Sequence, residues 1–177
     1  MFEEEEDNFR KSHEEIRKMP IFKKGWHIFK LADKITSLVS NDGEYEHLPE
    51  TERELLMHQA EQLRGDAMMI CPKISGAEGA GLYDLRMEYA AIIRKAARDV
   101  QTGCSGLELW GFKHTEYLEL LRDEVEEFRV LFAKWVKTFD VSNYTIDRWG
   151  LFNPPGINYD DIDPDDDIPF DPSDFLE

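Results

Sequence analysis

The chain has 177 residues, a length that fits one folded domain with flanking segments, and a formal net charge of −17 at pH 7. Residues 150–177 contain nine acidic residues and no basic one. This balance disfavours nucleic-acid binding, which usually leaves a basic footprint. Two cysteines without a paired spacing predict a reduced, cytoplasmic protein. The acidic start of the sequence argues against a signal peptide. The sequence also lacks an apolar run of roughly 18 residues, so we expect no membrane span.

An N-terminal segment, residues 1–19, precedes the main domain. It is rich in Glu, Lys and Arg and has few apolar anchors. We expect a surface helix over residues 3–18, which Pro20 ends or redirects.

The main domain, residues 20–140, begins with an amphipathic helix. Apolar residues from Phe22 to Val39 recur at helical spacing, and Asn41-Asp42-Gly43 then supplies turn chemistry. A second helix follows Pro49, a residue that suits a first helical turn.

Small and medium apolar residues mark one face of this second helix. They step by four and three from Leu56 to Ala77, which predicts a close approach by a neighbouring helix. An interior proline removes a backbone hydrogen bond and clashes with the preceding turn, so Pro72 predicts a kink at residues 68–72. We expect the helix to end at the glycines that follow, which are Gly76, Gly79 and Gly81.

Two more helices complete the domain. The third covers residues 83–100, with Arg94, Lys95 and Arg98 predicted to point outward. Gly103-Cys104-Ser105-Gly106 is expected to break it before an apolar connection. The fourth starts at Lys113, and its apolar residues follow a heptad spacing from Leu118 to Phe139. Four long helices with mostly short links predict an all-α fold, an antiparallel up-down-up-down four-helix bundle.

The last segment, residues 141–177, interleaves aromatic residues with prolines and aspartates. Disordered tails are usually poor in aromatics, so we expect an extended acidic arm packed on its own bundle or on a neighbouring subunit. The run Asp161–Asp167 with Asp174 is similar to a calcium loop but lacks the glycine and the bidentate Glu of such loops. Loose attraction of cations or docking to a basic partner fits this composition better.

Metal and catalytic signatures are weak. A di-metal bundle needs inward carboxylates and Glu-x-x-His pairs on two helices, whereas His58 with Glu61, and His114 with Glu116, show other spacings. We therefore expect no metal, no other cofactor and no catalytic residues. The sequence also lacks a Ser-His-Asp pattern, which favours a protein that is not an enzyme.

The cysteines and glycines have structural explanations. Cys71 stands on an apolar helix and is expected to be a buried thiol, and Cys104 in the glycine-rich break is expected to be more exposed. The three glycines after Pro72 follow a helix and lack the lysine of a phosphate-binding loop.

Surface residues therefore carry the functional hypotheses. Four tryptophans and eleven phenylalanines exceed what a small bundle easily covers, and aromatics are enriched at protein interfaces. We predict a homo-oligomeric scaffold or protein-interaction module with Trp26, Trp110, Phe112, Trp149 and Phe152 at the interface. The alternative is a nucleic-acid-associated factor, for which the candidate residues are Lys23, Lys24, Lys30, Lys34, Arg94, Lys95 and Arg98.

One stretch also resembles a known family. Gln59–Gly79, with Leu63-Arg64-Gly65-Asp66-Ala67 and Ile70-Cys71-Pro72-Lys73-Ile74-Ser75-Gly76-Ala77-Glu78-Gly79, is similar to the bacterial four-helix bundle family. That family includes proteins encoded in intervening sequences of 23S ribosomal RNA genes and accessory proteins of diversity-generating retroelements. The resemblance implies an antiparallel bundle without known enzyme activity, assembled as a ring-like homo-oligomer, a pentamer in the best-known members. The nucleic-acid-binding relatives are basic, whereas this chain is acidic.

Overall fold

The computed structural model describes residues 11–41 and 43–163, and within these ranges the chain is helical and contains no strand. The expected all-α class is confirmed. The helices are α1 (His13–Lys18), α2 (Pro20–Asn41), α3 (Glu50–Ala80), α4 (Tyr83–Leu109) and α5 (Thr115–Val136).

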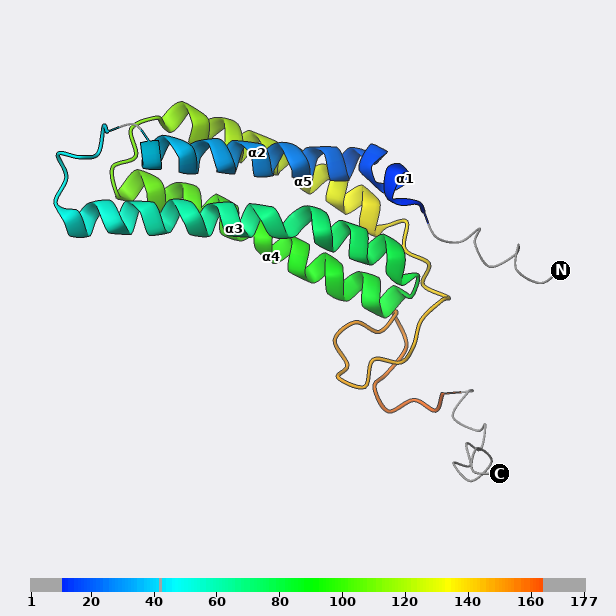
Figure 1. The fold of residues 1–177 in the computed structure, drawn as a ribbon. Coiled ribbons are helices and arrows are strands. Elements are labelled where there is room, and N and C mark those ends of the chain that lie inside the picture. The colour runs from blue at the N-terminus through cyan, green and yellow to red at the C-terminus, as the bar shows by residue number, and fades with distance from the viewer. Residues whose placement is uncertain (1–10, 42, 164–177) are drawn as a thin grey trace, which may run out of the picture.

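The four long helices, α2 to α5, lie alongside one another and form an elongated body (Figure 1). Helix α2 contacts α3 and α5, and α4 contacts the same two helices from the other side. The α3–α4 contact is the most extensive, whereas α4 and α5 touch over a smaller area. The short helix α1 rests on α2 and α3.

The core follows the apolar spacings predicted for the second and fourth long helices. On α3 the residues that step by four and three from Leu56 to Ala77 are buried. On α5 the heptad residues are buried except for Phe132, which is partly exposed. The buried residues of this row are Leu118, Leu121, Val125, Phe128, Trp135 and, just beyond the helix, Phe139.

Of the helix ends predicted at glycines, the one at Gly81 is confirmed, because Gly81 caps α3 with a φ of 74°, whereas those at Gly76, Gly79 and Gly103 were wrong. Helix α3 continues through Gly76 to Ala80, and α4 continues through Gly103 to Leu109. A Cβ at Gly76 would lie 2.8 Å from Cε1 of Tyr89, and a Cβ at Gly103 would lie 2.9 Å from Cδ1 of Leu63. These glycines have no side chain, so they let α3 and α4 approach closely. The helices continue through them because this packing outweighs the low helix propensity of glycine.

The start of α1 and the prolines Pro20 and Pro72, which lie within helices, differ in their effects on the helices. Helix α1 begins with a capping box formed by Ser12 and Glu15, and the first part of the helix expected over 3–18 lies outside the described residues. Pro20 is the first residue of α2, where its missing N–H costs nothing. Pro72 lies within α3, which continues past it, and a bend at residues 68–72 stays a prediction.

After α5 the described chain, residues 137–163, forms turns without a helix or strand. It is joined to the start of α4, where Tyr83 N–H donates to the Asn143 carbonyl at 2.7 Å. The Thr145 N–H also donates to the Asp84 carboxylate at 2.9 Å. Residues 164–177, with most of the acidic run that is similar to a calcium loop, lie outside the described residues.

Candidate functional site

An apolar groove lies between α2 and α3, and we call it the α2/α3 groove. Its cavity has a volume of about 440 Å³. Trp26 is 46% exposed and Met68 is 52% exposed, so large apolar side chains of both helices reach the solvent here. The apolar side chains of the lining are Phe22, Trp26, Phe29, Ala67, Met68 and Pro72.

This groove exists because α2 is apolar on more than one side. Its buried row, which includes Ile21 and Ile28, already faces the core. Phe22, Trp26 and Phe29 recur at steps of four and three beside that row, and the rings of Trp26 and Phe29 lie 5.3 Å apart. Because the core is filled by the first row, the second row remains partly exposed at the surface.

The residues predicted for an interface lie on different elements of the structure. Trp26 lies on α2, Trp110 follows α4, and Trp149, which is 91% exposed, lies in the segment after α5. Phe152 is partly buried and lines a shallow cavity against α3 and α4.

Phe112 corrects the predicted list. It is only 3% exposed, because it closes the core at the turn between α4 and α5. Its ring stacks on Tyr45 at a centroid distance of 6.4 Å and meets the edge of His114 at 5.7 Å. An aromatic residue in a connection can thus cap its own core instead of meeting a partner.

The candidate nucleic-acid residues fall on two helices. Lys23, Lys30 and Lys34 are exposed on α2. Lys24 is instead ion-paired with Glu124 at 2.8 Å and Glu127 at 2.5 Å, and these contacts raise its pKa.

On α4 the three candidate cations differ in their partners. Arg94 and Arg98 are exposed and have no ion pair among the described residues, whereas Lys95 pairs with Asp99. Sequence reasoning predicted all three to point outward, and the structure places them so.

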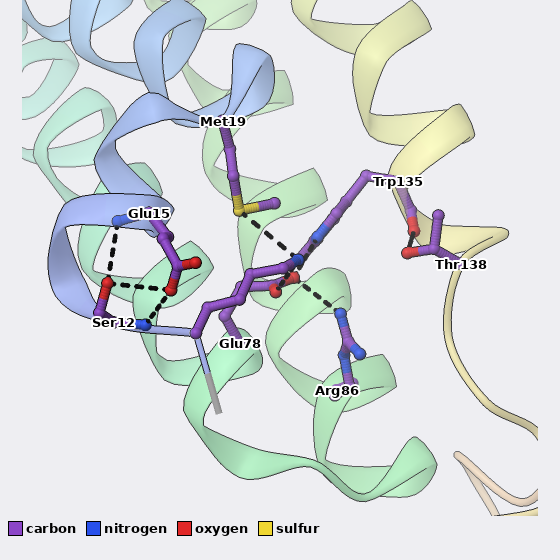
Figure 2. A network of polar contacts seen from close by, with 8 residues as sticks. Ser12, Glu15, Met19, Glu78, Arg86, Trp135 and Thr138 are labelled. Atoms are coloured by element: carbon purple, nitrogen blue, oxygen red, sulfur yellow. Dashed lines mark hydrogen bonds and ion pairs between the residues drawn. The ribbon is translucent and has the colours of Figure 1, made fainter. Parts of the chain in front are cut away.

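The structure also reveals a buried carboxylate that the sequence analysis missed. Glu78 is 7% exposed, although it follows the small apolar face of α3. Its Oε2 accepts a hydrogen bond from Lys11 Nζ at 2.6 Å. Its Oε1 accepts from Arg86 at 2.7 Å and from the Trp135 indole at 2.6 Å, and Figure 2 shows these two side chains converging on Glu78.

These contacts explain the charge state of Glu78. Burial raises its pKa, but the hydrogen bonds from Lys11 and Trp135 and the charge of Arg86 outweigh burial and lower it overall. The Arg86 guanidinium also lies 4.1 Å from the centre of the Phe139 ring. Glu78 and its three partners, which we call the Glu78 cluster, thus join α3, α4 and α5 to the chain before α1. The role of this cluster is structural.

Metal ligation finds no support in the part of the chain that the structure describes. It contains no group of three or more His, Cys, Asp or Glu residues placed to hold an ion. His114 lies 2.9 Å from a Glu44 oxygen and 3.7 Å from a Glu116 oxygen, while His58 is exposed on α3.

The expected exposure of Cys104 was wrong. Its side chain is fully buried, because α4 continues through the glycines that were expected to end it. Burial raises the pKa of Cys104 to about 11 and that of Cys71 to about 12. Neither thiol has the lowered pKa of a nucleophile.

We compared the chain with known protein families, curated proteins and solved structures. No protein-family model, no curated protein and no solved structure matches this chain. Within the described residues, none of the helices has the length and apolar character that crossing a bilayer requires.

Proposed function

We propose that this chain is a non-enzymatic helical protein that acts as a homo-oligomeric scaffold or protein-interaction module. In this proposal the four long helices form an antiparallel up-down-up-down bundle of the bacterial four-helix bundle family. Residues 1–19 and 141–177 flank that bundle, the latter as an acidic arm. The proposed location is the cytoplasm, where the two buried thiols stay reduced.

The observation that carries the proposal is the exposed lining of the α2/α3 groove. Trp26 and Met68 belong to residue types enriched at protein interfaces, and here they line one groove together with Phe29 and Pro72. Stable interfaces bury about 1,200–2,000 Å² in total, more than one groove supplies. A second copy of the chain would therefore also cover the polar rim around the groove, where Arg17 and Lys23 lie.

The bundle topology has support in the helix contacts. Each of α2 to α5 contacts two of the others, and each link between consecutive helices in this set is short. The same order of four helices is what the resemblance of Gln59–Gly79 implies for the family.

Light scattering on the full chain tests the assembly. We expect a mass that is a multiple of the 20.7 kDa chain. The double variant Trp26→Asp/Met68→Asp should shift the mass toward 20.7 kDa, because two charges would be buried in the proposed contact. Val130→Asp, at an exposed apolar residue of α5, is the matched control and should leave the mass unchanged. A constant monomer at all protein concentrations would contradict the proposal.

A nucleic-acid-associated role is the second candidate, and one observation favours it. Lys23, Lys30 and Lys34 are exposed on a single helix and have no ion pair among the described residues. Binding to single-stranded RNA or to DNA should then weaken steeply as salt rises, and Lys30→Glu/Lys34→Glu should weaken it further. If the protein does not change the gel mobility of either nucleic acid at low salt, this candidate function is excluded.

A further inference from the structure

A second groove lies between α4 and α5, which contact each other less than the other neighbouring pairs of long helices do. Its volume is about 360 Å³, and we call it the α4/α5 groove. Apolar side chains of α5, among them Val125, Phe128 and Phe132, form its floor. Three arginines, Arg94, Arg98 and Arg129, also line it, and the described lining includes no acidic residue.

Two of these arginines have no anionic partner among the described residues, namely Arg94 and Arg98. Arg129 pairs with Glu126 one turn earlier on the same helix, with N–O distances of 2.5–2.9 Å. Both members of that pair are exposed, and such pairs exchange partners at little cost. The groove therefore combines positive charge with apolar surface, in a chain whose net charge is −17.

The matching chemistry is an acidic peptide with apolar anchors, and this chain contains one outside the described residues. Residues 164–177 include six acidic residues and no basic residue. Their large apolar residues are Ile168, Phe170, Phe175 and Leu176. A fully extended segment of fourteen residues spans at most about 50 Å. This length is the upper limit on how far the end of the segment can lie from residue 163.

We propose that residues 164–177 bind in the α4/α5 groove, in the same chain or in a second copy. Aspartates of the segment pair with Arg94 and Arg98, while one or both of its phenylalanine rings cover Phe132 and the floor beside it. The contact is independent of the α2/α3 groove, so it can exist whether or not that surface joins two copies.

Site-specific photocrosslinking in the full chain tests the contact. With Phe170→p-benzoylphenylalanine, irradiation should yield crosslinked peptides that contain residues of α4 or α5 from the groove, such as Gln101 or Phe132, identified by mass spectrometry. Product at the monomer mass would indicate binding within one chain, and product at the dimer mass would indicate binding to a second copy. Either result supports the proposal.

Charge reversal supplies the specificity control. Arg94→Glu/Arg98→Glu should lower the yield of groove crosslinks about tenfold, because each reversal replaces an attraction by a repulsion. Lys30→Glu/Lys34→Glu makes the same change of net charge on α2 and should leave the yield unchanged. If the first double variant does not fold, Arg94→Gln/Arg98→Gln replaces it, with a smaller expected loss.

Three outcomes would overturn the proposal. The first is the absence of groove crosslinks, and the second is crosslinks that map elsewhere. The third is an equal loss of yield in both double variants, which would reflect net charge alone. If the groove gives no crosslink but binds single-stranded RNA in a way that needs Arg94 and Arg98, its ligand is a nucleic acid and the peptide assignment fails.

Discussion

At the scale of single residues, Glu78 shows how the interior tolerates a charge. An isolated buried carboxylate is strongly unfavourable, so such a group must be paired and hydrogen-bonded. Glu78 has three donors from three segments, Lys11, Arg86 and Trp135. The partners come from distant parts of the chain, so this cluster forms only when the helices are assembled.

We expect Glu78→Gln to lower the free energy of unfolding by about 2–4 kcal/mol, as breaking a buried ion pair does. The amide keeps an acceptor for Trp135 but leaves the mostly buried Arg86 without its counter-charge. Urea unfolding followed by circular dichroism measures the change. Glu14→Gln, which removes one exposed pair with Lys18, is the control and should have little effect.

The pH dependence of the free energy of unfolding should also reflect the charge of Glu78. Because the pKa of Glu78 is lower in the folded chain than its ordinary value of 4.5, its contribution is present above pH 4.5 and is lost as the pH falls through the folded pKa. Between about pH 6 and about pH 3 the wild type should therefore lose more stability than Glu78→Gln. Equal losses in the two proteins would show that Glu78 does not titrate with a lowered pKa.

The cysteines should be chemically quiet in the folded protein. With raised pKa values, Cys71 and Cys104 carry little thiolate near pH 8, and both side chains are buried. We expect alkylation by iodoacetamide to be at least about a hundredfold slower in the native protein than in urea. Mass spectrometry of each cysteine peptide distinguishes the two, and rapid labelling of Cys104 alone would favour the exposed position that the sequence suggested.

At the scale of elements, glycines decide how closely α3 and α4 pack. Gly103 faces Leu63, which is fully buried, and an added Cβ would lie 2.9 Å from Leu63 Cδ1 and 3.3 Å from Leu63 Cβ. Gly103→Ala should therefore destabilise the protein by about 1–3 kcal/mol through overpacking, although alanine has the higher helix propensity. Thermal or urea unfolding measures the change.

Gly65 provides the matched control within the same helix pair. A Cβ at Gly65 would meet no atom within 4 Å, so only the intrinsic preference for alanine remains. Gly65→Ala should stabilise the protein by roughly 0.5–1 kcal/mol. The same sign of change in both variants would contradict the assignment of Gly103 to close helix contact.

The spacing of apolar residues predicted the long helices better than their ends. The rows on α3 and α5 repeat over several turns, so the match to a helical period does not depend on any single residue. The ends predicted at Gly76 and Gly103 were wrong, because a glycine that stops an isolated helix can also be the residue that lets a second helix pack against it.

At the scale of the whole molecule, the segment after α5 is held to the start of α4. Asp84 accepts a hydrogen bond from the Thr145 N–H, and Tyr83 N–H donates to Asn143. Asp84→Ala should free this attachment and raise the rate of limited proteolysis within residues 141–163, with the helix content unchanged. Asp123→Ala, at an exposed acid of α5, is the control and should not change the cleavage rate.

The sequence by itself determined the all-α class, the rows of core residues on α3 and α5 and the outward position of Arg94, Lys95 and Arg98. These features depend on the period of one helix, which is local information. Only the tertiary structure decided that Phe112 and Cys104 are buried, that Glu78 is charged inside the protein and that Trp26 and Met68 line one groove. Each of these depends on which distant segment packs against the residue, and a linear pattern does not contain that information.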